Sequence, residues 1–203
     1  MKNLLIISAS LLILSISAAA QTEIAIQGSY EMPIDEMKWV FKPGQGVTLT
    51  LSKMKERRKK RSVIGLNVGF SKFVPKEDIF YYLVNEDELG TIRYKDMLVY
   101  QLGLHLRQDF ILQEHIELFY GFEMGYYYTK YGYESRDPYI IEDSYNFIGR
   151  GAVAARVGVN FPITEHVGAF FQTKYLVSIG PSDDEDNIIN VYWNNSAGLN
   201  FRF

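Results

Sequence analysis

Histidine, serine and carboxylate side chains are the residues of this sequence that could support acyl transfer, in which a neighbouring base activates a serine hydroxyl. The sequence holds three histidines. His115 and His166 fall at short turns between predicted strands, and His105 is expected on the polar side of a strand. No serine can be placed within hydrogen-bond reach of a histidine from these positions. We therefore expect no catalytic residues and a protein that is not an enzyme.

Carboxylates gather in residues 181–187, PSDDEDN, which contain Asp183, Asp184, Glu185 and Asp186. Oxygen ligands of this kind bind Ca²⁺ or Mg²⁺, but the run lacks the spacing and central glycine of a calcium-binding loop. A solvated acidic loop is the favoured interpretation, with no metal site and no cofactor. The chain also contains no cysteine, which excludes thiol catalysis, disulfides and cysteine-ligated zinc.

Basic residues gather in KMKERRKKR, residues 53–61. Three interpretations remain open for this run: a solvated turn, a docking point for a protein partner, or contact with phospholipid head groups. Each Lys or Arg near an anionic surface contributes ~1 kcal/mol to such a contact. The formal net charge of the whole chain is −3, so no nucleic-acid partner is expected.

The N-terminal residues 1–20 have the pattern of a secretory signal peptide. Lys2 precedes an apolar run at 4–16, and the small residues SAAA follow at 17–20. Cleavage before Gln21 leaves residues 21–203, which is enough for one domain.

Alternation of apolar residues with polar or small ones recurs along this domain and predicts strands that have two different faces. Between Leu98 and Leu106, for example, five apolar residues alternate with Val99, Gln101, Gly103 and His105. Eight strands are predicted, at 22–31, 45–55, 61–74, 95–110, 115–130, 149–162, 166–179 and 190–203. Short turns separate some of them, and long polar connections are expected at 32–44, 75–94, 131–148 and 180–189.

The composition of the two faces decides which one points outward. One face is Leu, Val, Ile, Phe and Tyr with almost no charge, and the other is mainly Gly, Asn, Ser, Ala and Gln. A soluble barrel would show Lys, Glu and Thr to water, whereas a membrane barrel turns its apolar face to lipid and keeps polar groups inside. A sheet in lipid must also close on itself. The sequence therefore predicts an all-β fold, an eight-stranded antiparallel up-and-down transmembrane β-barrel.

The same alternation predicts which charged side chains point into the barrel. They are Arg107, Glu117, Glu123, Arg156, Lys174 and Arg202, together with His105. A hairpin centred near residue 112 would place Arg107 opposite Glu117, and Gln101 opposite Glu123. Eight strands enclose a space just wide enough for side chains, and a buried charge needs a partner. We expect a salt-bridge network that plugs the lumen; the alternative is an ion or proton path.

Eight strands return both termini to one side, which after export is the periplasmic side of the outer membrane of a Gram-negative bacterium. The long connections then face outside. Counted as 31–46, 74–96, 131–149 and 180–190, they hold 17 acidic and six basic residues. Outer-membrane lipid and lipopolysaccharide are the expected surroundings.

The signal peptide, the eight alternating strands, the short turn TEH and the ending GLNFRF resemble the outer-membrane β-barrel domain proteins of Bacteroidetes-type bacteria. These are small barrels similar to the OmpA transmembrane domain and OmpX, and close to the PorT-like group. In that family an alternating last strand that ends in Phe is read by the barrel-assembly machinery. The resemblance places this signal on Tyr192 or Trp193, Leu199, Phe201 and Phe203.

The function expected from the sequence is a structural or surface-interaction role through acidic extracellular loops. One alternative is a small channel or transporter for small or hydrophobic molecules. The resemblance to the PorT-like group implies another, an accessory component of a secretion or surface-assembly machine with a periplasmic or surface protein partner.

Overall fold

The computed structural model describes residues 21–34, 37–85, 88–113, 115–136, 141–179 and 191–203. The predicted signal peptide, residues 1–20, and the acidic run 181–187 lie outside the described residues. Within the described part of the chain, no helix is long and apolar enough to cross a membrane.

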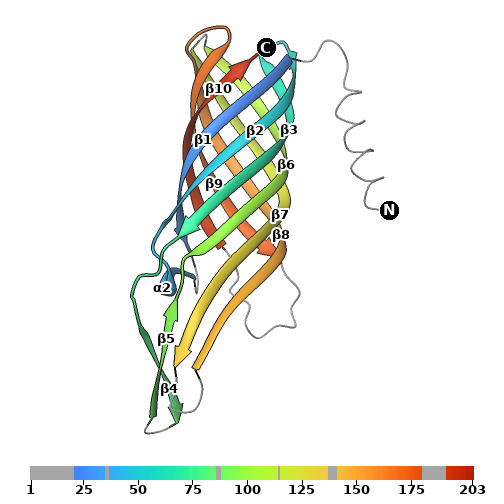
Figure 1. The fold of residues 1–203 in the computed structure, drawn as a ribbon. Helices are drawn as coiled ribbons and strands as arrows, with labels where there is room; N and C mark the ends of the chain where they lie inside the picture. Colours follow the sequence, from blue (N-terminus) through green and yellow to red (C-terminus); the bar gives the residue numbers. More distant parts are fainter. Residues whose placement is uncertain (1–20, 35–36, 86–87, 114, 137–140, 180–190) are drawn as a thin grey trace, which may run out of the picture.

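Eight antiparallel strands form a closed barrel, and the ends of β1 and β10 nearest the termini lie at the same end of it (Figure 1). Around the barrel the order is β7-β6-β3-β2-β1-β10-β9-β8, and the pairing of β7 with β8 closes the ring. The predicted eight-stranded antiparallel barrel is confirmed. Its strands are β1 (Gln21–Pro33), β2 (Gly44–Arg57), β3 (Lys60–Phe73), β6 (Met97–Gln113), β7 (Ile116–Arg136), β8 (Ile141–Pro162), β9 (Val167–Ile179) and β10 (Val191–Arg202).

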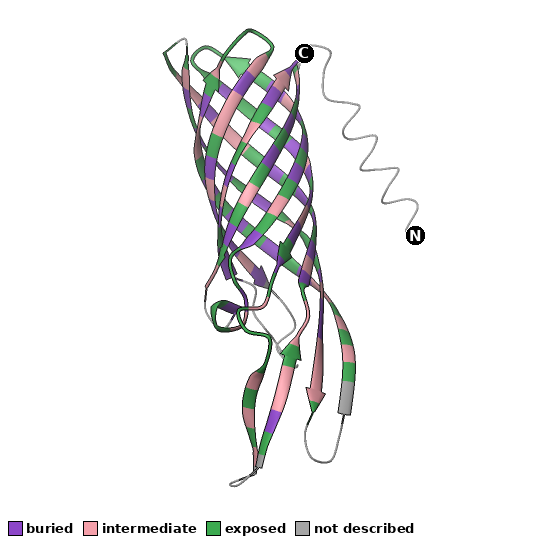
Figure 2. Cartoon of the chain, turned by 60° about the vertical axis from the view of Figure 1, so that its left-hand side comes forward, coloured by how far each residue is buried: buried purple, intermediate pink, exposed green. Residues whose placement is uncertain are grey.

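Burial alternates along the barrel strands (Figure 2), and most of the large apolar side chains of these strands are on the exposed face. Leu104 is 50% exposed and Phe122 is 63% exposed, whereas the inward-facing Gln101 and Glu123 are each 4% exposed. Successive side chains of a strand point to opposite faces, so the period of two in the sequence becomes an apolar outside and a polar inside. This is the arrangement expected of a barrel surrounded by hydrocarbon.

Two of the predicted long connections are largely strands, which corrects the sequence analysis. Residues 75–94 contain a hairpin of β4 (Phe80–Asn85) and β5 (Glu88–Tyr94), and β5 pairs with the far end of β7. Residues 131–148 mostly continue β7 and β8, which pair from Glu117↔Asn160 to Arg136↔Ile141. The four strands form a sheet that projects beyond the barrel at the end opposite the termini (Figure 1). We call it the projecting sheet.

A short helix, α2 (Met37–Val40), lies at the same end of the barrel (Figure 1). Met37 and the following Phe41 are fully buried, and they belong to one apolar cluster with Phe73, Met97 and Tyr192. We call Met37, Phe41, Phe73, Met97 and Tyr192 the mouth cluster. Backbone hydrogen bonds from Lys42 N to the Val74 carbonyl, and from Lys76 N to the Val40 carbonyl, hold the segment in place.

Candidate functional site

The interior near the termini holds six charged side chains, which we call the terminal charge cluster. All six side chains are at most 10% exposed. Three are carboxylates and three are guanidinium groups, so their formal charges cancel. The members are Glu23, Arg61, Arg107, Asp109, Glu117 and Arg202.

Glu117 is the centre of one half of this cluster. Arg202 donates two hydrogen bonds to it, with Nη2 2.7 Å from Oε2 and Nη1 3.2 Å from Oε1. Arg61 Nη1 lies 3.0 Å from Glu117 Oε1, and Asn160 Nδ2 donates to Oε2 at 2.6 Å. Two-pronged Arg–carboxylate pairs are among the strongest polar contacts in proteins. Strands β3, β7, β8 and β10 are therefore joined through one carboxylate.

Arg107 is the centre of the other half of the terminal charge cluster. Its Nε lies 2.7 Å from Asp109 Oδ1 and its Nη2 lies 3.0 Å from Asp109 Oδ2. The same Nη2 lies 3.0 Å from Glu23 Oε1, while Arg202 Nε is 3.3 Å from Glu23 Oε2. Glu23 thus connects the two halves across the barrel.

A second charged group lies deeper in the barrel, around Glu123. Lys174 Nζ is 3.2 Å from Glu123 Oε2, and Arg156 Nη1 is 3.9 Å from the same oxygen. The Tyr127 hydroxyl donates to Glu123 Oε1 at 3.0 Å. The ring of Phe119 lies between the two groups of charges, 5.2 Å from the Arg107 guanidinium carbon and 5.8 Å from that of Arg156.

The structure corrects the sequence analysis on one point of chemistry, because a serine does lie within hydrogen-bond distance of a histidine. Ser52 Oγ is 3.3 Å from His105 Nε2, and His105 Nδ1 is 3.0 Å from Asn67 Oδ1. The pair comes from β2 and β6, which are not neighbours in the sheet, so strand alternation alone could not place them together. Ser52 is 2% exposed and His105 is fully buried.

Toward the mouth, the buried Glu31 is bound by neutral groups. Its Oε1 accepts hydrogen bonds from Ser71 Oγ at 2.7 Å, Asn194 Nδ2 at 2.8 Å and Ser29 Oγ at 2.9 Å. Gln101 Nε2 extends this network by donating to Ser71 Oγ at 3.1 Å. The apolar mouth cluster lies beyond this network, further from the termini.

All six charged residues expected in the lumen point inward, but they are paired differently from the predicted register. Arg107 lies opposite Gly121 and not Glu117, while Glu123 lies opposite His105 and not Gln101. The hairpin is centred near residue 114, because β6 continues to Gln113 and carries an irregularity between Ile111 and Gln113. The partners of Arg107 are Glu23 and Asp109, those of Glu117 are Arg61 and Arg202, and those of Glu123 are Lys174 and Arg156.

Three members of the terminal charge cluster were missed in the sequence: Glu23, Arg61 and Asp109. Each has the inward parity of its strand, since Glu23 alternates with Ile24, Arg61 aligns with Val63 and Gly65, and Asp109 aligns with Arg107. Strand alternation therefore indicated their orientation, but these residues lie at strand ends that resemble turns.

Among the described residues, no group of three or more His, Asp and Glu side chains could hold a metal ion.

Of the residues expected to carry the assembly signal, Trp193, Leu199 and Phe201 lie on the outer face of β10, and Phe203 follows the strand. Trp193 is 42% exposed, Leu199 43% and Phe203 71%, while Phe201 is partly buried. Tyr192 points inward and is fully buried in the mouth cluster. β10 pairs along its length with β1, with Phe201 opposite Ile24, so the last strand meets the first.

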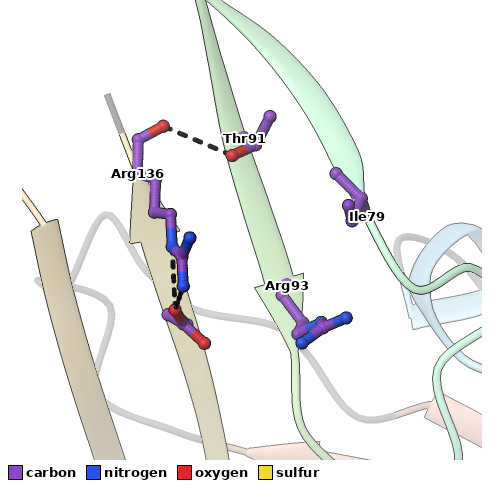
Figure 3. A pocket seen from close by; sticks show the side chains of 5 residues that line it. Ile79, Thr91, Arg93 and Arg136 are labelled. Atoms are coloured by element: carbon purple, nitrogen blue, oxygen red, sulfur yellow. Dashed lines mark hydrogen bonds and ion pairs between the residues drawn. The ribbon is translucent and has the colours of Figure 1, made fainter. Parts of the chain in front are cut away.

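A shallow pocket of about 160 Å³ lies on the projecting sheet, lined by Ile79, Thr91, Arg93, Glu134 and Arg136 (Figure 3). Arg136 Nε donates to Glu134 Oε1 at 2.9 Å, and Thr91 Oγ1 lies 3.4 Å from the Arg136 carbonyl oxygen.

The base of the projecting sheet carries an exposed ion pair of Lys95 and Asp143. The hydrogen bond from Lys95 to Asp143 raises the pKa of the lysine above its ordinary value. The Lys95 ammonium also lies 4.2 Å from the ring centre of Tyr145.

No protein-family model matches the sequence, and no curated protein sequence matches it. Several solved structures do match. A major outer membrane protein from Thermus thermophilus superposes with a TM-score of 0.56 at 14% identity, covering 90% of this chain and 99% of that one. Neisserial surface protein A gives 0.53 at 14% identity, covering 90% and 97%. The fold is that of a small outer-membrane β-barrel. Ail, the attachment invasion locus protein of Yersinia pestis, is a further match, with a TM-score of 0.50 at 13% identity and coverage of 91% and 99%.

Proposed function

We propose that this chain is a non-enzymatic integral protein of a Gram-negative outer membrane, with a plugged lumen and a structural or surface-interaction role. The fold shared with the outer-membrane proteins above supports this location. The apolar outer face supports insertion, because each exposed Leu or Phe would otherwise contact water. We place both termini on the periplasmic side, since β1 begins and β10 ends at the barrel end with the short turns.

The observation that carries the plugged lumen is the series of side chains that crosses the barrel interior. From the termini inward it consists of the terminal charge cluster, the group around Glu123, the hydrogen bonds of Glu31 and the mouth cluster. An eight-stranded barrel has room for side chains and little else. Each buried charged side chain in this series also needs an oppositely charged partner, because an uncompensated buried charge lowers the stability of the fold.

The experiment is single-channel recording of the folded protein in planar lipid bilayers. A plugged barrel gives no large, stable conductance, and the alternative of a small channel or transporter gives one. The double variant Met37→Gly/Phe41→Gly removes side chains at the mouth but leaves the charged groups deeper in the lumen. It should therefore also show no stable conductance. A steady open level in the wild type would refute the plugged lumen.

The projecting sheet supports the surface-interaction role. It carries exposed apolar side chains far from the barrel, with Tyr81 70% exposed, Leu83 72% and Leu89 62%. The acidic loop at 180–190 lies outside the described residues, so its share in binding stays a prediction from the sequence.

A role as an accessory component of a secretion or surface-assembly machine, as the resemblance to the PorT-like group implies, makes a separate prediction. Gently solubilised wild-type protein would then retain a protein partner that is lost when residues 79–94 are replaced by a short turn. Recovery of the wild type without a partner would favour the structural role.

A further inference from the structure

The basic run 53–61 forms the β2–β3 hairpin at the terminal end of the barrel, and the interior network uses only one of its cations. Arg61 points inward and pairs with Glu117 and Glu56. The other cations are Lys53, Lys55, Arg57, Arg58, Lys59 and Lys60, and all except the partly buried Lys53 are exposed.

Strand register places four of these cations on the lipid-facing side. Lys53 is opposite Ile64, Lys55 is opposite Ser62, and Arg57 is opposite Lys60. Lys53, Lys55 and Arg57 have the parity of Leu49 and Leu51, which are 54% and 48% exposed on the apolar outer face. The outer face of β2 therefore changes directly from leucine to lysine and arginine.

With Leu51, the last exposed leucine of β2, taken as the edge of the hydrocarbon, Lys53 falls within the head-group layer and the other cations lie further out. At about 3.3 Å per residue, Lys53 lies ~7 Å and Lys55 ~13 Å beyond Leu51 along a tilted strand. The head-group layer on each side of the hydrocarbon is roughly 5–8 Å thick. Next to the cations, Phe110 stacks on Tyr120 with ring centres 5.7 Å apart, and Lys60 lies 5.4 Å from the Phe110 ring centre. Aromatic rings of this kind mark the interface in membrane barrels.

No acidic side chain shares this face. The outward residues of β2 and β3, from Gln45 to Arg57 and from Lys60 to Lys72, are neutral or basic. Glu56 has the opposite parity, and its carboxylate is bound by Arg61. Among the described residues, no carboxylate forms an ion pair with these outward cations, so an external anion can balance their charge.

The turn residue Arg58 adds a second observation. Its φ is 57°, in the left-handed region where glycine or asparagine is normally found. The sequence has a cation at a position where a residue without a side chain would fit the backbone better.

We propose that the outward cations of the β2–β3 hairpin, Lys53, Lys55, Arg57 and Lys60 with Arg58 and Lys59 at its tip, bind the phosphates of anionic phospholipids. The lipids are those of the leaflet on the side of the termini. This inference rests on the proposed membrane insertion. The ligands of the hairpin are then anionic phospholipids. Their binding holds the terminal end of the barrel at a fixed depth in the membrane.

The test measures how strongly the protein prefers spin-labelled phosphatidylglycerol over spin-labelled phosphatidylcholine, by electron paramagnetic resonance of the protein in phosphatidylcholine vesicles. The wild type should prefer the anionic lipid, and added salt should weaken that preference. Each cation removed near an anionic surface is expected to cost roughly fivefold. The triple variant Lys55→Ala/Arg57→Ala/Lys60→Ala should therefore lose most of the preference. Arg58→Gly removes one charge and suits the backbone, so its smaller loss cannot be caused by misfolding.

The matched control removes three exposed cations at the other end of the barrel, in Lys38→Ala/Lys42→Ala/Lys76→Ala. It should keep the preference of the wild type. Equal preferences in the wild type and the hairpin triple variant, or an equal loss in the control, would overturn the inference. Displacement of the labelled lipid by millimolar inorganic phosphate would also overturn it, because a site for free phosphate needs no membrane. If the wild type inserts into neither lipid, the proposed function fails first and the inference fails with it.

Discussion

At the end of the barrel interior near the termini, three carboxylates and three guanidinium groups neutralise one another. At the opposite end, which we call the loop end, the side chains of the mouth cluster pack as an apolar group. The charged end is built from barrel strands alone. The apolar end needs a segment from outside the barrel, the helix α2 and the residue after it. Charges buried among strands depend on every partner, while an apolar lid can relax when one side chain is cut back. The two ends should therefore respond differently to mutation.

The largest expected effect is that of Glu117→Gln in the terminal charge cluster. The substitution leaves the buried Arg61 and Arg202 without their shared carboxylate. Loss of one member of a buried ion pair costs about 3–5 kcal/mol in the free energy of unfolding. Urea titration of the protein in lipid vesicles measures it. The control Glu56→Gln removes the half-exposed partner of Arg61 and should cost under about 1 kcal/mol. Equal effects would show that burial does not distinguish the two carboxylates.

The inside and outside of the barrel could be predicted because alternation in strands reports the face directly. Leu104 and Glu123 fall on the expected sides for this reason. Pairing could not be predicted with the same accuracy. A turn displaced by two residues changes every cross-strand neighbour, which is why Arg107 was assigned to Glu117 although it lies opposite Gly121. Its ion-pair partner Asp109 lies two residues further along the same strand.

The missed elements have local physical causes. Met37 and Phe41 are four residues apart, the spacing of one helical face, but the surrounding polar residues resembled a loop. The β4–β5 hairpin was missed because neither strand alternates: β4 is the nearly continuous apolar run FYYLVN, β5 is ELGTIRY, and charged residues flank both. The contact between Ser52 and His105 depends on barrel closure, which brings side chains of non-neighbouring strands together.

At the loop end, Met37→Ala should lower the free energy of unfolding by about 2 kcal/mol, the low end for truncating a buried methionine. The low value is expected because α2 borders the solvent and can partly collapse into the gap. Trp39→Ala on the same helix removes a side chain that is 69% exposed and should change stability by less than about 0.5 kcal/mol. A loss at Met37 as large as that at Glu117 would remove the contrast between the two ends.

Between the two ends, Ser52→Ala should cost about 1 kcal/mol, the net contribution of one buried hydrogen bond. Ser62→Ala is the matched control, because Ser62 binds Gln108 at an exposed position. Thermal unfolding of both variants in the same detergent checks the difference. Identical midpoints would mean that the contact of Ser52 with His105 adds no stability.

The smallest effect concerns the exposed pair of Lys95 and Asp143 outside the barrel. The bound carboxylate raises the pKa of Lys95 in the folded protein. A raised lysine pKa means that the stabilisation is present below the ordinary lysine pKa and is lost as the pH rises through the folded value, so the loss is confined to alkaline pH. In Asp143→Asn, the titration midpoint of Lys95 followed by nuclear magnetic resonance should fall toward the ordinary value. An unchanged midpoint would assign the shift to another group.

The central claim is that the apolar face of every barrel strand contacts lipid while the charged face is enclosed. Nuclear magnetic resonance of the methyl groups in nanodiscs that contain an acyl-chain spin label tests it directly. The outward Leu49, Leu104 and Val153 should be strongly broadened, and the inward Ala152 and Ala154 should be much less affected. Equal broadening of both sets, or a folded protein in plain buffer with its outward leucines unaffected by the label, would contradict the account.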